Sequence, residues 1–243
     1  MADKYAVRQL IADTIGEQYL IPLLGVWDRF DDINYDELPD RFVLKTTHDS
    51  GSVVLCKDKN TLDLKAARKK LTKSLSNNYF WAGREYPYKN IPPRIIAEEY
   101  MINEGEFDLP DFKFFCFNGV PTVLFYASER FNEKGEKGHV KFDYYDMNLN
   151  HLPIKSRGHE NSSKPLCPFP QFDEMKQLAS QLSKGFPFLR VDFYLINGHV
   201  YFGELTFHHD GGVVPFVPEE WNYTLGDKIV LDIDKNQSGQ RTK

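Results

Sequence analysis

Two long apolar runs in the sequence are each interrupted by one Asn-Gly pair. The first run covers residues 111–128 around Asn118-Gly119, and the second covers 190–207 around Asn197-Gly198. Asn-Gly readily adopts the positive φ angles of a two-residue hairpin turn, so both runs predict antiparallel strand pairs. Because the hairpins are mixed with helical segments, we expect an α+β protein with antiparallel sheets and not a doubly wound parallel sheet.

Periodicity elsewhere gives the remaining outline. Apolar residues recur at helical spacing in 3–18, 62–77 and 172–184. Short β-rich runs cover 42–45, 52–56 and 94–98, while proline-rich connections cover 83–93 and 150–170. We therefore divide the chain into an N-terminal helix and connection, a small subdomain, a large subdomain and a flexible polar tail, with the ranges 1–39, 40–101, 102–233 and 234–243.

Composition limits the classes of function. The 243 residues include 30 basic and 35 acidic side chains, which gives a net charge of −5. This balance does not favour a general attraction to nucleic acid or to an anionic membrane. We expect no membrane span and a cytoplasmic location, because no 18-residue apolar run and no apolar signal region occur. Three widely spaced cysteines, Cys56, Cys116 and Cys167, predict reduced, buried thiols.

Two acidic residues, Asp192 and Glu204, stand inside the apolar strands of the second hairpin. Buried carboxylates are costly unless they are paired or bind a cation, and two of them suit Mg²⁺ that carries phosphates. A plain two-residue hairpin would point them to opposite faces, whereas a three-residue connection or a bulge sets Asp192 opposite Glu204. The same shift sets Arg190 opposite Thr206. We expect the shifted register; the alternative is that both carboxylates face solvent or pair only with Arg190.

A lysine ends an apolar strand and is followed by a loop of small residues. Lys45 closes the run, and His48, Ser50, Gly51 and Ser52 follow it. An ammonium group and several backbone N–H groups can surround phosphates, with His48 as a weaker contact. This is not a Walker loop, and a plain surface hairpin is the alternative.

A third segment, Glu98-Glu99-Tyr100-Met101, ends another apolar strand. It can present backbone groups and an apolar wall to a purine base. The alternative is that Tyr100 and Met101 belong to the core. Lys113 and Lys141 can face the same ligand from the sheet or can be surface lysines.

In this order, the segments resemble the ATP-grasp fold, and specifically its TupA-like branch, which is associated with cell-surface polysaccharide and teichuronopeptide synthesis. The opening stretch from Asp3 through Lys4 to Arg8 is similar to the family's Asp-Lys helix, with Arg8 where many members place a nucleotide-binding lysine. The resemblance runs to about Gly212. It implies two α+β subdomains whose antiparallel sheets clasp ATP, without the separate N-terminal substrate domain of many ATP-grasp ligases.

The resemblance implies roles for these residues. ATP contacts are expected from Arg8, Lys45, His48, Ser50, Gly51, Ser52, Glu98, Glu99, Tyr100, Met101, Asp111, Lys113 and Lys141. Asp111 falls where an acidic residue usually binds ribose. Arg190 is expected to steady the transferring phosphoryl group, and Asp192 and Glu204 to hold Mg²⁺. Thr206 stands where the family commonly has a metal-binding Asn, so a second Mg²⁺ is expected to be held more weakly.

The loop after the second hairpin carries His208 and His209, followed by Asp210, Gly211 and Gly212. Histidines titrate near neutrality. We expect this loop to hold an acyl phosphate or to deprotonate an incoming amine; the alternative is a solvated turn.

Together these features predict an ATP- and Mg²⁺-dependent carboxylate–amine ligase that acts through an acyl phosphate. Its expected partners are an amine and a small-molecule or nucleotide-linked sugar acid, with no nucleic acid. One alternative is a glycosyl- or phosphotransferase of the same pathway, against which the lack of a clear Asp-x-Asp motif counts. The other is a nucleotide-binding module with reduced catalysis.

Overall fold

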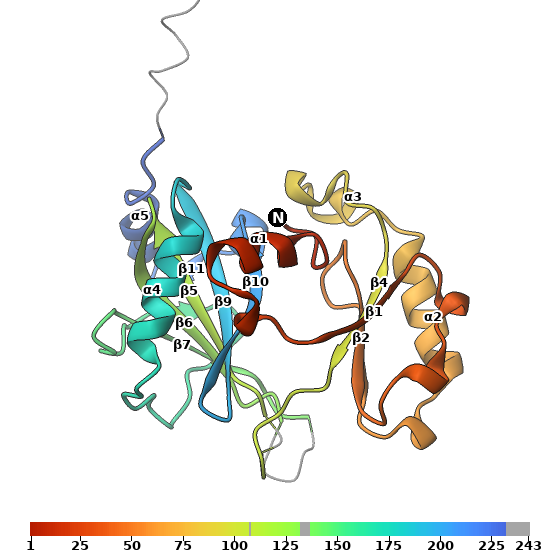
Figure 1. Cartoon of the computed structure of the whole chain (residues 1–243). Coiled ribbons are helices and arrows are strands. Elements are labelled where there is room, and N and C mark those ends of the chain that lie inside the picture. Colours follow the sequence, from red (N-terminus) through yellow and green to blue (C-terminus); the bar gives the residue numbers. More distant parts are fainter. Residues whose placement is uncertain (107, 132–136, 232–243) are drawn as a thin grey trace, which may run out of the picture.

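The chain forms two lobes, each built on an antiparallel sheet, with helix α1 between them (Figure 1). The computed structural model describes residues 1–106, 108–131 and 137–231. The small sheet has the order β1-β4-β2-β3, and its strands are β1 (Leu23–Trp27), β2 (Phe42–Thr46), β3 (Val53–Cys56) and β4 (Ile95–Glu99). The large sheet has the order β10-β9-β5-β6-β7, and its strands are β5 (Asp111–Phe117), β6 (Val120–Ser128), β7 (Lys141–Tyr145), β9 (Phe188–Ile196) and β10 (His199–Thr206).

Helices and short elements surround the two sheets. The α-helices are α1 (Val7–Thr14), α2 (Leu64–Leu75), α3 (Phe80–Gly83), α4 (Phe172–Ser183) and α5 (Glu220–Gly226), and the short strands β8 (Lys155–Ser156) and β11 (Phe216–Val217) pair with each other. Single 3₁₀ turns cover Glu17–Tyr19, Phe30–Asp32, Tyr35–Glu37, Lys59–Thr61, Tyr86–Tyr88 and His209–Gly212. No helix among the described residues is long and apolar enough to cross a membrane.

Alternation along β2 separates the core of the small lobe from its inner face. Phe42 and Leu44 are fully buried against Ala67 and Leu71 of α2. Lys45 comes from the opposite face of the same strand, because successive side chains of a strand point to opposite sides. The outer face of the small sheet is therefore its core, and the inner face is left for polar groups.

The large sheet has a core on each face. Val191 and Phe193 of β9 pack with Met175 and Leu182 of α4 in one core, which also contains Ile11 of α1. On the other face, a second core joins aromatic residues of β5–β7 to Leu225 of α5. Arg190 and Asp192 come from this second face, since they alternate with the residues that pack on α4.

Both predicted hairpins are present, and each has an extra residue in its second strand. Asn197 and Gly198 have φ values of 51° and 78°, so they form the two-residue turn with positive φ angles. Phe202 pairs with Phe193 but Glu204 pairs with Asp192, which leaves Gly203 as a bulge. Thr206 pairs with Arg190. The shifted register is thereby confirmed, and the bulge produces it.

The other sequence expectations hold in part. Helix α4 occupies nearly all of the predicted range, whereas α1 is shorter than 3–18 because the Asp3 carboxylate accepts the N–H groups of Tyr5 and Ala6 before it. Strand β1 lies in the predicted connection and belongs to the small sheet, outside the expected range 40–101. The predicted loop 150–170 contains β8. Cys56 and Cys116 are buried thiols, but Cys167 is exposed, which corrects that prediction. The predicted tail 234–243 lies outside the described residues.

Candidate active site

Two adjoining cavities lie where the inner faces of the lobes meet. The smaller is about 40 Å³ and is lined by Lys4, Arg8 and Glu204, among others. The larger is about 430 Å³, a volume typical of small-molecule sites. They share four lining residues, Ile21, Lys45, Glu98 and Tyr194. The cavities are therefore parts of one cleft.

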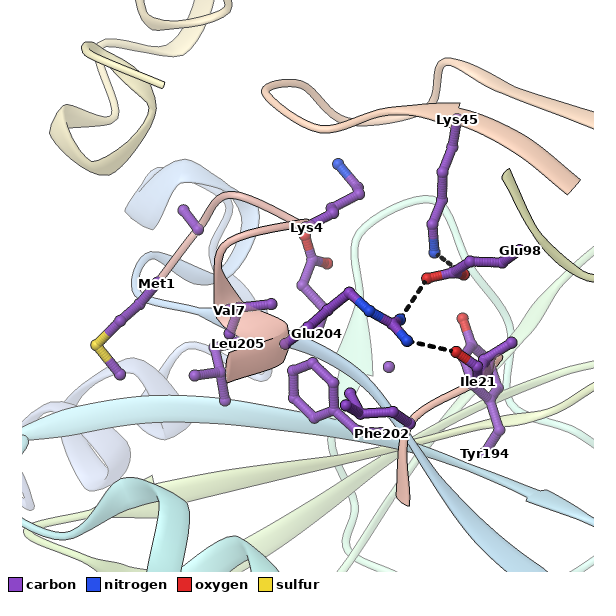
Figure 2. A pocket seen from close by; sticks show the side chains of 14 residues that line it. Met1, Lys4, Val7, Ile21, Lys45, Glu98, Tyr194, Phe202, Glu204 and Leu205 are labelled. Carbon is purple, nitrogen blue, oxygen red and sulfur yellow. Dashed lines mark hydrogen bonds and ion pairs between the residues drawn. The ribbon is translucent and has the colours of Figure 1, made fainter. Parts of the chain in front are cut away.

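A buried carboxylate holds two cations at the junction of the cavities. Lys45 Nζ lies 2.5 Å from Glu98 Oε2, and Arg8 Nη1 lies 3.1 Å from Glu98 Oε1 (Figure 2). Arg8 also donates to the carbonyl of Ile21 at 2.8 Å. The Glu98 side chain is only 7% exposed, so burial strengthens both ion pairs. The group has one net positive charge and suits an anionic ligand.

The predicted hinge residues line the larger cavity. Glu99, Tyr100 and Met101 form one side, and Val43, Val53 and Leu55 of the small sheet add an apolar wall. Arg41 stacks over the Tyr100 ring at 4.6 Å. An apolar wall beside a charged junction fits a flat ring attached to a negatively charged group.

Hydrogen bonds to Asp49 fix the first part of the predicted phosphate loop. Asp49 is buried, accepts a hydrogen bond from Thr46 and accepts another from Ser74 at 2.5 Å. Burial alone would raise the pKa of Asp49, but hydrogen bonds from Ser52, Ser74 and Thr46 outweigh it and hold this pKa below its ordinary value. Ser50 and Gly51 form an exposed tip beyond this anchor, with Gly51 at φ 87°.

His48 lies outside the cleft, and this corrects its predicted phosphate contact. Its Nε2 is 3.1 Å from the carbonyl oxygens of both Ser74 and Asn77, so the ring donates toward the end of α2. The imidazole is 2% exposed. Lys141 also lies elsewhere: its Nζ is 2.7 Å from the exposed Glu160, and neither cavity includes it.

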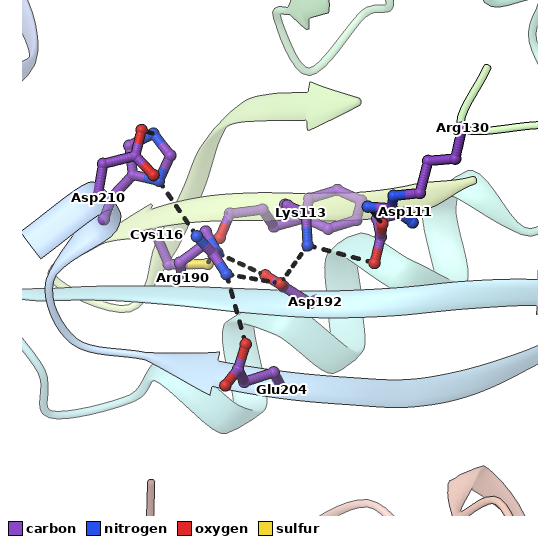
Figure 3. Close-up of polar contacts among 10 residues, drawn as sticks. Asp111, Lys113, Cys116, Arg130, Arg190, Asp192, Glu204 and Asp210 are labelled. Atoms are coloured by element: carbon purple, nitrogen blue, oxygen red, sulfur yellow. Dashed lines mark hydrogen bonds and ion pairs between the residues drawn. The ribbon is translucent and has the colours of Figure 1, made fainter. Parts of the chain in front are cut away.

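Strands β9 and β10 present the predicted carboxylates on one face (Figure 3). Arg190 Nε donates to Asp192 Oδ1 at 2.8 Å, and Arg190 Nη2 donates to Oδ2 at 2.8 Å. Glu204 Oε2 is 3.6 Å from Arg190 Nη2, and its side chain is 32% exposed. The buried Arg190 and Lys113 cations hold the pKa of Asp192 below its ordinary value, although burial would raise it. Asp192 is thus saturated by cations, whereas Glu204 remains accessible.

The hydroxyl group of Thr206 lies at the expected metal site. Its Oγ1 is buried and has no hydrogen-bond partner in the described structure. A buried hydroxyl without a partner is costly, and a bound cation would satisfy its lone pairs. With Glu204 nearby in β10, the donor set of carboxylate and hydroxyl oxygens fits a hard cation such as Mg²⁺. The described residues contain no cluster of three or more His, Cys, Asp or Glu side chains that could hold a metal. Ligand oxygens would therefore have to complete the shell.

A chain of ion pairs links this centre to the larger cavity. Lys113 Nζ lies 2.6 Å from Asp192 Oδ2 and 3.2 Å from Asp111 Oδ1, and Arg130 pairs with Asp111 (Figure 3). Asp111 is 3% exposed and does not line the cavity, whereas Asp108 and Arg130 do. The predicted ribose contact of Asp111 is therefore corrected: this carboxylate positions Arg130.

The two loop histidines have different surroundings. His208 is exposed, which fits both an accessible base and the solvated turn that was the alternative. The His209 ring is enclosed by Phe115, Phe125 and Phe216, and its Nδ1 accepts from Arg190 Nη1 at 3.1 Å. Burial and the neighbouring guanidinium lower the pKa of His209 to about 4. His209 is thus a neutral partner of Arg190, which corrects its predicted role as an accessible base.

Lys4, Arg130 and Tyr194 also line the cleft, although none of them is among the predicted site residues. Lys4 Nζ donates to the carbonyl of Asp49, and burial lowers the pKa of Lys4. For Lys4, the sequence signal of a site role is its position next to Asp3. For Tyr194, the signal is its place two residues after Asp192 in the same strand. Arg130 follows β6, and no sequence signal marks it as a site residue.

Comparison with known proteins identifies the fold class. The structure resembles D-alanine–D-alanine ligase from Bacillus anthracis, with a TM-score of 0.51, 14% identity, and coverage of 94% of this chain and 66% of that one. It also resembles the ATP-grasp ligase PsnB complexed with a phosphomimetic variant of its minimal precursor, Mg and ADP (TM-score 0.48, 11% identity, 94% and 59% coverage). The chain spans less than two thirds of either protein. No curated protein sequence matches it. The fold is that of the ATP-grasp proteins, as predicted.

The family model described as TupA-like ATPgrasp matches residues 1–230. The chain therefore belongs to the TupA-like ATP-grasp family, and the resemblance seen in the sequence is confirmed.

Proposed function

We propose that this protein is an ATP- and Mg²⁺-dependent ligase that joins an amine to a carboxylate through an acyl phosphate. The observation that carries the proposal is the alignment of Asp192 and Glu204 on one face of the β9–β10 hairpin, beside a cleft lined by Lys45 and Arg8. Family membership and the fold support this assignment.

The cleft offers a place for each part of ATP. The base fits the larger cavity, against Tyr100 and Met101. The phosphates fit the positive junction around Lys45 and Arg8. Glu204 and Thr206 would hold Mg²⁺ together with phosphate oxygens, and Asp192 lies opposite Glu204. The bound ion would neutralise charge on the phosphates.

The reaction needs positioning and charge neutralisation more than a protein nucleophile. A carboxylate oxygen of the substrate forms a bond to the γ-phosphorus, the bond from that phosphorus to the β-phosphate oxygen breaks, and ADP leaves. The amine nitrogen then bonds to the acyl carbon, inorganic phosphate leaves, and the amine gives up a proton. Arg190, oriented by Asp192 and His209, would steady the transferring group, and exposed His208 would accept the proton.

We further propose that the carboxylate belongs to a sugar acid or glycan precursor used in surface polysaccharide synthesis. Membership of the TupA-like family supports this choice of substrate. Arg190 pairs with both Asp192 and Glu204 on the large sheet, which argues against a binding module that has lost its catalytic groups.

ADP release from ATP, measured with a panel of uronic acids and amines, tests the proposal. We expect ADP and phosphate to appear only when an acid and an amine are both present. Glu204→Gln and Asp192→Asn should each lower turnover about 100-fold or more. Glu160→Gln changes an exposed carboxylate outside the cleft and should leave turnover unchanged. Unchanged turnover in both cleft variants would contradict the proposed site, and ATP binding without turnover on any pair would favour a binding module.

A further inference from the structure

A third cavity, of about 370 Å³, lies next to the proposed centre and has an apolar lining. Its walls include Phe117, Phe188, Phe207, Phe216, Leu225 and Ile229. His208 and His209 line it as well. Two of its apolar residues, Val214 and Ile229, are 41% and 40% exposed. Apolar side chains left exposed around a cavity commonly mark a binding site.

Strand β9 connects this cavity to the nucleotide side of the cleft. Phe188, Arg190, Asp192 and Tyr194 alternate along the strand and therefore come from one face of it. Tyr194 lines both cavities of the cleft, and Phe188 lines the third. Tyr194 comes six residues after Phe188, which corresponds to about 20 Å along the strand. Arg190 and Asp192 thus separate two binding regions on one face.

Polar groups near the cavity favour a cation at its entrance. His208 and Asp210 are exposed on the loop that follows β10. Burial raises the pKa of Glu85 of the small lobe. The charges of Glu204 and Asp210 raise this pKa further, and those of His208 and Arg190 lower it. Glu85 therefore lies in the electrostatic field of this entrance. His208 lines the cavity, and the charges of His208, Glu204 and Asp210 act on Glu85, so this entrance suits an ammonium group that must lose a proton.

The interior offers few groups for a polar ligand. The Asn222 side chain accepts from the Phe216 N–H at 2.9 Å and donates to the Glu219 carbonyl at 3.0 Å. His209 Nδ1 is bonded to Arg190, and the buried Nε2 of the same ring, without a hydrogen-bond partner in the described structure, offers one donor. A sugar ring would leave most of its hydroxyl groups without partners here, and that is costly. An aryl or branched alkyl group would not.

We propose that this cavity binds the apolar side chain of the amine substrate, so that the amine is an amino acid or related compound with an aromatic or branched alkyl side chain. The assignment of this ligand as a substrate rests on the proposed ligase function. The ammonium group lies at the His208 entrance, and the side chain fills the space between Phe188 and Ile229.

Binding of two amides to the full chain tests the proposal without ligation. L-phenylalaninamide and glycinamide share the ammonium and amide groups and differ in the side chain. A ligand-observed NMR titration of each should show L-phenylalaninamide binding about tenfold or more tightly, as burial of an aromatic side chain predicts. Equal affinities, or no saturable binding of L-phenylalaninamide, would overturn the proposal.

Two pairs of neighbouring valine and isoleucine residues give matched controls. Val214→Asp and Ile229→Asp place a charge in the cavity wall and should weaken L-phenylalaninamide binding about tenfold. Val213 and Val230 are 82% and 62% exposed and do not line the cavity. Val213→Asp and Val230→Asp should therefore change the affinity less than about twofold. Equal losses in both pairs would overturn the assignment.

Mg²⁺-ATP binding on the same samples separates this proposal from the proposed function. Selective L-phenylalaninamide binding without Mg²⁺-ATP binding would contradict the ligase and leave the apolar amine site standing. Mg²⁺-ATP binding with equal affinity for the two amides would contradict only the apolar site.

Discussion

Asp192 and Glu204 are direct partners across β9 and β10, although the turn that joins these strands has only two residues. Gly203 makes this pairing possible, because its bulge moves Glu204 to the face that Asp192 occupies. The charged centre thus depends on one residue that carries no functional group.

Gly203→Ala should disturb this pairing. An added Cβ would lie 3.1 Å from the Asp192 carbonyl oxygen and 3.2 Å from Cε2 of Tyr194, so the strands must shift. We expect a loss of about 1–3 kcal/mol in the free energy of unfolding, measured by urea denaturation, together with lower ATP turnover. Gly226→Ala is the matched control for stability alone, since its added Cβ meets nothing within 4 Å but Gly226 lines the third cavity. Equal stability of the two variants would show that the bulge tolerates a side chain.

Glu98→Gln should lower the stability of the protein and make that stability depend more strongly on bound ATP. The variant leaves the Arg8 and Lys45 cations, whose side chains are 15% and 20% exposed, without their counter-ion. We expect the free energy of unfolding to fall by about 3 kcal/mol, and ATP to recover part of this loss because its phosphates replace the carboxylate. Thermal unfolding with and without Mg²⁺-ATP measures both effects. Glu160→Gln, a change at an exposed carboxylate that lines neither cavity of the cleft, should behave like the parent protein.

The stability of the protein should fall in mild acid because His209 is buried as a neutral ring. Its pKa is about 4 in the folded chain, below the ordinary value of 6.5, so the unfolded chain binds the proton more readily. The contribution is complete above pH 6.5 and is lost as the pH falls toward 4. Urea denaturation at pH 7 and pH 4.5 should show this loss, on the order of 2 kcal/mol, in the parent protein. In His209→Gln the loss should be smaller, and an equal loss in both proteins would assign it to other groups.

One thiol should react in the folded protein, and three after unfolding. Burial raises the pKa of Cys56, and it raises the pKa of Cys116 to about 12, so neither forms the reactive thiolate near neutral pH. Cys167 is exposed. Titration with a thiol-specific chromogenic reagent before and after adding guanidinium measures both numbers. Cys167→Ser should abolish the native reaction, and any remaining fast reaction would mean that a core opens more readily than its burial indicates.

Local sequence signals predicted the hairpins and helix α4 because turn residues and helical spacing act over a few positions. The carboxylate register also followed from a local conflict between an apolar strand and two acidic residues. Strand β1 could not be found in this way, since Leu23–Trp27 becomes a strand by pairing with β4, which lies about 70 residues later.

The surroundings of the histidines could not be predicted for a related reason. His209 is enclosed by rings from β5, β6 and β11, and His48 is fixed by carbonyl groups at the end of α2. Both environments are assembled from segments far apart in the chain. Adjacent histidines such as His208 and His209 look equivalent in the sequence and differ only after packing.

The alternation along β9 places the two proposed binding regions, for ATP and for the amine side chain, at opposite ends of one strand face. Changes at the Phe188 end can reshape the apolar cavity while Tyr194, about 20 Å away, keeps its place beside the larger one. Relatives with this hairpin could therefore diverge in the molecules they join by exchanging residues at one end, with the central charges inherited unchanged.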